Sequence, residues 1–133
     1  MPPPALGGVL ETVLYVQDLS EAERFYVDVL GFRKLSGEPG RQLFLRAGRS
    51  VLLLFRAEAT LRPGPLPPHG ARGPGHVCFE VPEPAYAAWK SYLPSRGVPL
   101  LQEQAWSRGG RSLYFHDPDK NLLEIADRDF WPK

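Results

Sequence analysis

The order of predicted elements along this chain occurs twice, and this internal repeat constrains the fold more than any other feature. A strand-forming segment at residues 11–16 is followed by an amphipathic helix and three further strand-forming segments. The same order begins again with a strand at residues 76–81. The positions that become equivalent are Glu11 and His76, Gly31 and Gly97, residues 43–45 and 113–115, and Leu53 and Glu124. A repeat of this length indicates two copies of one βαβββ module.

Two such modules predict an α+β fold in which each four-stranded sheet carries helices on one face only. The uncovered faces then form a cupped mixed sheet, with the helices on its outer face. We expect one domain, because 133 residues fit a single hydrophobic core. The first module covers about residues 9–58, a linker rich in Pro and Gly covers residues 59–73, and the second module covers residues 74–128.

Local signals predict where the two helices begin and end. Ser20 and Glu23 have the spacing of a capping box, so Ser20 is the expected N-cap of the first helix. Gly31 is expected to end that helix in a left-handed conformation. Pro84 suits the first turn of the second helix, and Pro94 should kink or end it early. The apolar residues expected on the buried faces are Phe25, Tyr26, Val29 and Leu30 in the first helix and Ala88, Trp89 and Tyr92 in the second.

Composition excludes several classes of protein. The net charge is +1 and the basic residues form no run, which argues against a nucleic-acid or acidic-membrane surface. The longest apolar run, residues 51–55, is far too short to span a membrane, and the first ten residues lack the features of a signal peptide. The single Cys78 allows no intrachain disulfide and is compatible with a reducing cytoplasm, which is the expected location.

A carboxylate lies in an unexpected place in the predicted hairpin of residues 111–127. Asp117 and Pro118 suit the turn between its strands. Glu124 follows in the second strand among apolar neighbours, Leu123 and Ile125. A buried carboxylate is costly without a cation, a hydrogen-bonding neighbour or water, so Glu124 needs a partner.

The repeat suggests partners for Glu124. Glu11, His76 and Glu124 occupy related positions in the two modules, so they are expected to surround one point on a pseudo-two-fold axis. One imidazole and two carboxylates suit a divalent ion such as Mn, Fe, Ni or Zn. Glu11 and Glu124 are also the candidate catalytic groups, because a carboxylate that leaves the metal can act as a base. Taken singly, Glu11 also fits a solvated strand end, and His76 a hydrogen-bonded edge histidine.

Other side chains are candidates for binding a substrate or for reacting with one. Aromatic walls with an arginine suit a small anionic or aromatic substrate, although core packing explains the aromatic residues equally well. Cys78 shares a face with His76, so a Cys/His nucleophile is an alternative, but their spacing favours a core-facing thiol. His116 is either an acid or base or a surface histidine, and His69 is expected to be a loop residue only. The candidate substrate-binding residues are Tyr15, Phe44, Trp106, Arg111 and Tyr114.

Across about residues 9–128 the sequence resembles the vicinal oxygen chelate superfamily, which includes glyoxalase I, extradiol dioxygenases, and fosfomycin- and bleomycin-resistance proteins. The resemblance rests on three segments: VLYVQDLSEAERFYVDVLGF at 13–32, GPGHVCFEV at 73–81 and GRSLYFHDPDKNLLEI at 110–125. It implies paired modules, a homodimer, and a metal held by the first and last strands of each module. The implied ligand positions are Glu11, Leu53, His76 and Glu124.

The chain departs from this family at several of its characteristic positions. Leu53 occupies the place of a fourth ligand in glyoxalase I, and Glu11 occupies the place of a histidine in extradiol dioxygenases and fosfomycin-modifying enzymes. Lys120 replaces a glycine that is common in the turn. The resemblance therefore implies a metal-dependent enzyme for a small substrate with vicinal oxygens, with lyase, isomerase or oxygenase chemistry open. A non-catalytic small-molecule binding or antibiotic-resistance protein of the bleomycin-resistance type is the alternative, and a structural dimer with a vestigial site is a third possibility.

Overall fold

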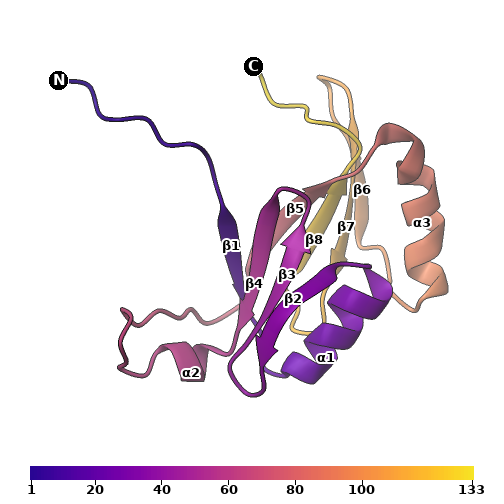
Figure 1. The fold of residues 1–133 in the computed structure, drawn as a ribbon. Coiled ribbons are helices and arrows are strands. Elements are labelled where there is room, and N and C mark those ends of the chain that lie inside the picture. The colour runs from indigo at the N-terminus through magenta and orange to yellow at the C-terminus, as the bar shows by residue number, and fades with distance from the viewer. The chain divides into compact units, whose positions relative to one another are not determined.

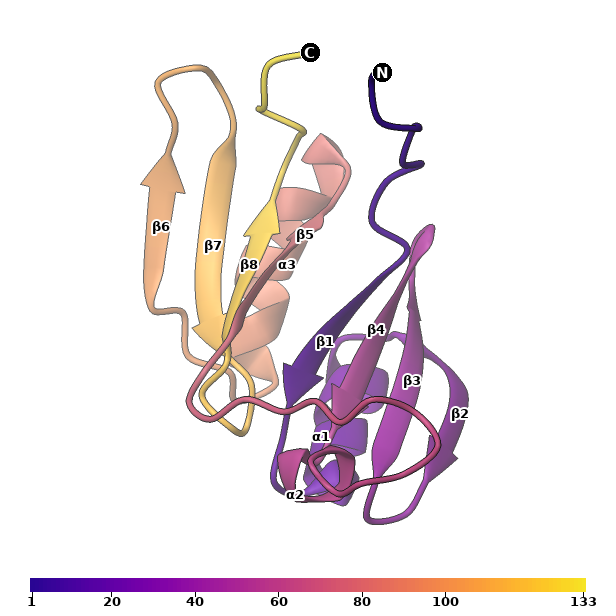
Figure 2. The ribbon, with the colours of Figure 1, turned by 90° about the vertical axis from the view of Figure 1, so that its left-hand side faces the viewer.

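The computed structural model describes residues 1–133 and contains two compact units, residues 1–70 and 71–133. Each unit is a four-stranded mixed sheet with its main helix on one face, α1 (Leu19–Glu23) in the first unit and α3 (Tyr86–Ser95) in the second, as the repeat predicts (Figure 1, Figure 2). The α+β fold of two βαβββ modules is therefore confirmed. None of the helices has the length and apolar character needed to cross a membrane.

The sheet of the first unit has the strand order β1-β4-β3-β2. β1 pairs in parallel with β4, and the other pairs are antiparallel. Alternation along the strands places one set of side chains against the helix, and these form the core of the unit. Its elements are β1 (Glu11–Tyr15), α1 (Leu19–Glu23), a π-helical continuation η1 (Arg24–Val29), β2 (Arg33–Glu38), β3 (Gln42–Ala47), β4 (Ser50–Phe55) and α2 (Ala57–Thr60). The buried residues of this core are Leu14, Ala22, Tyr26, Leu30, Leu43, Leu45, Leu52 and Leu54.

The first helix begins earlier than the capping-box spacing predicts. Asp18, not Ser20, is the N-cap, and its carboxylate accepts hydrogen bonds from the backbone N–H groups of Ser20 and Glu21. The prediction was wrong because a carboxylate two residues upstream can cap an earlier first turn and adds favourable charge at the helix N-terminus. Gly31 ends the helical segment with a positive φ of 82°, as predicted.

The second unit repeats this arrangement with the strand order β5-β8-β7-β6. β5 pairs in parallel with β8, and the other pairs are antiparallel. The face covered by the helix holds the core. Its elements are β5 (His76–Glu80), a 3₁₀ turn η2 (Glu83–Ala85), α3 (Tyr86–Ser95), β6 (Gln102–Ala105), β7 (Arg111–His116) and β8 (Leu122–Ala126). The buried residues of this core are Tyr86, Leu93, Val98, Leu113, Phe115, Leu123 and Ile125.

The buried side of the second helix overlaps only in part with the predicted one, because Trp89 and Tyr92 are half-buried. Tyr86 and Leu93 are its buried residues, and Ala88 is exposed. Pro84 lies in the 3₁₀ turn, and the α-helix starts only at Tyr86. Pro94 lies in the last turn of the helix, consistent with the expected early end.

The strand registers confirm the equivalence of the two modules residue by residue. In the first sheet Leu53 lies opposite Val13 on one side and Phe44 on the other. In the second sheet Glu124 lies in the same way between Cys78 and Tyr114. The two sheets therefore present matching positions, but the central one is an alkyl group in the first and a carboxylate in the second.

Candidate functional site

Glu124 is the buried carboxylate of the second unit. It lies in the central strand β8, where only 6% of the residue is exposed, on the sheet face opposite α3. Its neighbours on the paired strands are Cys78 and Tyr114, and His76 lies one pleat away on β5. The polar side chains of His76, Cys78 and Tyr114 therefore surround the carboxylate. They are the partners that a buried carboxylate among apolar residues was expected to need.

The contact between His76 and Glu124 has an unusual electrostatic character. Nε2 of His76 lies 3.2 Å from Oε1 of Glu124, and Nδ1 lies 2.8 Å from the carbonyl oxygen of Leu122. A carbonyl can only accept, so Nδ1 carries a proton, and Nε2 presents either a second proton or a lone pair to the carboxylate. Two lone pairs at this distance repel each other unless a proton or a metal cation lies between them.

The same geometry fits a bound metal ion. Two ligand atoms about 2.1 Å from one ion lie roughly 3.0 Å apart at a right angle and about 3.4 Å apart at the tetrahedral angle. The observed 3.2 Å between Nε2 and Oε1 falls between these values. The bond from Nδ1 to the Leu122 carbonyl is also the support that metal-bound imidazoles usually have. His76 and Glu124 therefore fit two positions around a divalent ion.

The hairpin turn fixes the strand that carries His76. The Asp117 carboxylate accepts hydrogen bonds from the backbone N–H groups of Asp119 and Asn121 and from Nδ2 of Asn121, at 2.8–2.9 Å. Oδ1 of Asn121 in turn accepts a hydrogen bond of 2.7 Å from the N–H of Gly75. The turn between β7 and β8 is thus tied to the residue immediately before His76.

Cys78 is exposed, so the expectation of a core-facing thiol was wrong. Cys78 and His76 are two residues apart on β5, so their side chains lie on the same face of the sheet. Figure 2 shows that α3 covers the opposite face. Desolvation and then the charge and hydrogen bonding of Glu124 raise the pKa of the Cys78 thiol to about 12. A thiol with this pKa is protonated at neutral pH, which argues against the alternative of a Cys/His nucleophile.

Tyr114 is held between Glu124 and Ser112. Burial raises the pKa of Tyr114, and the charge and hydrogen bonding of Glu124 raise it further. Trp106 donates a hydrogen bond of 2.9 Å from Nε1 to Oγ of Ser112 and stacks on Phe130, with 5.4 Å between ring centroids. Of the two predicted substrate-binding aromatic residues of this unit, Tyr114 therefore interacts with Glu124 directly, and Trp106 is connected to it through Ser112 and Tyr114.

Arg111 lies on the other face of the second sheet. Its guanidinium lies over the ring of Tyr86, 4.1 Å from the centroid, and its Nε is 3.2 Å from Oδ2 of the buried Asp127. Arg111 and Tyr114 are an odd number of residues apart, so strand alternation separates them. The structure therefore does not bring the predicted arginine to the face that carries Glu124.

The predicted residues of the first unit lie on the uncovered face of its sheet. Glu11 is exposed at the start of β1, and Tyr15 and Phe44 lie farther along that face. The hydroxyl of Tyr15 is 2.6 Å from Nδ1 of His69, and the His69 ring meets Phe55 edge-on with 5.0 Å between centroids. His69 is thus part of an aromatic group, which its position in an aperiodic linker did not predict. Neither unit by itself contains three or more His, Cys, Asp or Glu side chains grouped to hold a metal ion.

Comparison with known proteins agrees with this architecture. Residues 8–125 match the family model of the glyoxalase, bleomycin resistance protein and dioxygenase superfamily. Among solved structures, the chain is similar to a lactoylglutathione lyase from Agrobacterium tumefaciens. That similarity has 35% sequence identity and a TM-score of 0.91, and it covers 99% of this chain and 100% of the other.

More distant similarities show the fold. A fosfomycin resistance protein from Mesorhizobium loti is 18% identical, with a TM-score of 0.67 and coverage of 94% of this chain and 95% of that one. A fosfomycin resistance protein from Listeria monocytogenes, solved as a mutant with Mn(II) and 1S,2S-dihydroxypropylphosphonic acid, is also 18% identical. Its TM-score is 0.72, with coverage of 94% and 93%. With its two βαβββ modules and a family match over nearly its whole length, this chain belongs to the glyoxalase, bleomycin resistance protein and dioxygenase superfamily.

Proposed function

We propose that this protein is a metal-dependent enzyme that acts on a small substrate with two neighbouring oxygen atoms. His76 and Glu124 hold a divalent ion in the second unit, and Glu11 completes the ligand set from its own chain or from a partner chain in a homodimer. The observation that carries the proposal is the 3.2 Å separation of Nε2 of His76 and Oε1 of Glu124, with Nδ1 already bonded to the Leu122 carbonyl.

The ion, when bound, acts as a Lewis acid that stabilises negative charge on a substrate oxygen. Other residues of the chain orient the two proposed ligands. The hydrogen bond from Nδ1 to Leu122 fixes the His76 ring, and Tyr114 orients the Glu124 carboxylate. Glu124, with little access to water, is also the group placed to accept a proton from a substrate carbon next to an oxygen.

Similarity to a lactoylglutathione lyase favours lyase or isomerase chemistry over oxygenase chemistry. The alkyl side chain of Leu53, 8% exposed at the position equivalent to Glu124, cannot be a ligand. The ligand set proposed here is therefore smaller than the four positions that the family resemblance implies. Formation of lactoylglutathione is the first activity to test, on protein loaded separately with Mn, Fe, Ni and Zn.

Elemental analysis tests the metal site independently of any activity. Protein purified without chelators should carry a divalent ion, and both His76→Gln and Glu124→Gln should lose it while keeping the far-UV circular dichroism of the parent. His116→Gln is the matched control, because this histidine lies on the neighbouring strand β7 outside the proposed ligand set. Absence of a divalent ion, or its retention in both site variants, rejects the proposal and favours a non-catalytic binding protein.

A further inference from the structure

The linker that follows β4 folds back over the uncovered face of the first sheet. We name residues 56–69 the strap. It contains α2, and its end is fixed by a hydrogen bond of 3.0 Å from the N–H of His69 to the carbonyl oxygen of Thr60. Tyr15 in β1 holds the same end through its contact of 2.6 Å with Nδ1 of His69. The strap is therefore attached to the sheet at a defined point.

A hollow of about 980 Å³ lies between the strap, the sheet and the turn joining β2 to β3. All of its lining residues belong to the first unit, between positions 38 and 69. Part of the lining is aromatic. The rings of Phe44 and Phe55 meet edge to face with 5.6 Å between centroids, and the ring of His69 also meets that of Phe55 edge to face. A planar apolar group has aromatic partners in this hollow.

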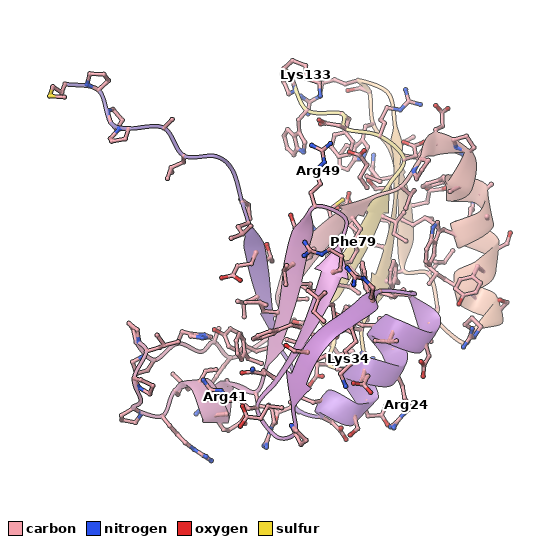
Figure 3. All side chains as sticks on the ribbon, in the orientation of Figure 1. Arg24, Lys34, Arg41, Arg49, Phe79 and Lys133 are labelled. Atoms are coloured by element: carbon pink, nitrogen blue, oxygen red, sulfur yellow. The ribbon has the colours of Figure 1, made fainter.

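The charged lining of the hollow is strongly asymmetric. Three arginines line it, Arg41, Arg56 and Arg62, against a single acidic residue, Glu38. Figure 3 shows Arg41 at the turn between β2 and β3, next to α2. Its Nη1 and Nε donate to the carbonyl oxygen of Ala59 and to Oε1 of Gln42, so Arg41 joins the strap to the sheet. Both acceptors are neutral, and the guanidinium of Arg41 has no carboxylate within salt-bridge distance.

Arg56 has one weak acidic partner. Its Nε is buried and makes no hydrogen bond, and its ion pair with Oε2 of Glu58 is long, at 3.9 Å. Arg62 is exposed in the strap. A second hollow of about 450 Å³ on the first unit shares Arg56 but has a different charge balance, because its other cation, Lys34, is paired at 2.6 Å with Glu23 and its lining also holds the carboxylates of Asp18 and Glu38.

We propose that the hollow beneath the strap binds a small organic anion, whose acidic group meets the arginines and whose planar apolar part packs on Phe44 and Phe55. Arginine is suited to carboxylate and phosphate groups because its guanidinium presents several donors in one plane. The site is built by the first unit alone, so it stands or fails separately from the metal site of the second unit.

Titration calorimetry and amide chemical-shift mapping with benzoate, phenyl phosphate and the neutral benzyl alcohol test this assignment at constant ionic strength. Saturable binding of either anion, with shifts confined to residues 38–69 and to Tyr15, which contacts His69, and weaker binding of the alcohol, supports it. The stronger of the two anions identifies the acidic group. Equal binding of the alcohol, or shifts elsewhere in the chain, overturns the proposal.

Arg62→Gln should weaken anion binding about tenfold, because it removes one charge-assisted contact. Arg49→Gln is the matched control. Arg49 belongs to the same unit but lies at the other end of the sheet, outside the lining of the hollow (Figure 3). Equal affinities in the two variants also overturn the proposal. Metal content is unaffected by either change, so a failure here is distinguishable from a failure of the proposed metal site.

Discussion

Tyr114 lies directly opposite Glu124 in the antiparallel pairing of β7 and β8. Burial and then the Glu124 carboxylate raise the pKa of Tyr114, so the phenol stays protonated and remains a hydrogen-bond donor at neutral pH. A donor in this place restricts the orientation of a carboxylate that is otherwise free to rotate. Tyr114 is therefore a positioning residue for the proposed metal ligand.

Tyr114→Phe should lower the affinity for the native divalent ion about tenfold, since it removes a support of a ligand without removing the ligand. The affinity is measured by competition with a chelating dye. Tyr92→Phe, a change of the same kind in α3, serves as the control and should leave the affinity unchanged. An unchanged affinity in Tyr114→Phe would show that Glu124 is oriented without it.

Cys78 should react slowly with iodoacetamide although it is exposed. With a pKa of about 12, only about 1 thiol in 10,000 is ionised at pH 8, so alkylation should be about 1,000 times slower than that of an ordinary thiol. Glu124→Gln removes the carboxylate but not the desolvation, and it should accelerate alkylation at least about tenfold. The rates are followed by mass spectrometry. Equal rates for the parent and Glu124→Gln would mean that the carboxylate does not influence the thiol.

The repeat and the alternation of side chains were sufficient to predict the architecture. The equivalence of Leu53 and Glu124 follows from the period of two along a strand and from the equal element order, and both strand registers agree with it. Alternation also contained a signal that the sequence interpretation did not use. It separates Arg111 from Tyr114, and the structure indeed places Arg111 with Tyr86 and Asp127.

Other parts of the site depend on information that a strand pattern lacks. Cys78 and Tyr114 flank Glu124 only because of the cross-strand register, which the sequence does not state directly. His69 reaches Tyr15 and Phe55 through an aperiodic linker, where no spacing rule applies. The N-cap was misplaced by two residues because two capping residues, Asp18 and Ser20, compete within one turn.

Lys120 adopts a left-handed conformation with φ of 67° in the turn between β7 and β8. A side chain with a Cβ atom is strained there, which is a physical reason to expect glycine at this position. Lys120→Gly should raise the free energy of unfolding by ~0.5–1 kcal/mol, measured by urea denaturation. Lys120→Ala keeps the Cβ atom and should bring no such gain. Equal stabilities of the two variants would show that the turn is not strained at this residue.

Asp127 should make the free energy of unfolding decrease as the pH falls into the acid range. Its residue is only 2% exposed, and burial by itself raises the pKa of the carboxyl. Hydrogen bonds from the backbone and side chain of Arg111, with the charge of Arg128, outweigh burial and hold the pKa of Asp127 below its ordinary value.

A pKa lowered by folding contributes stability above the unfolded value of about 3.9, and this contribution is lost as the pH falls through the folded value. Asp127→Asn should therefore be less stable than the parent by about 2 kcal/mol at pH 7, and the difference should shrink between about pH 4 and pH 2. Urea denaturation at each pH measures both. Asp28→Asn, a change at an exposed aspartate, should reproduce the parent's pH dependence. A constant difference between Asp127→Asn and the parent across this range would mean that the loss comes from altered packing, because only an ionised carboxylate with a lowered pKa makes the difference depend on pH.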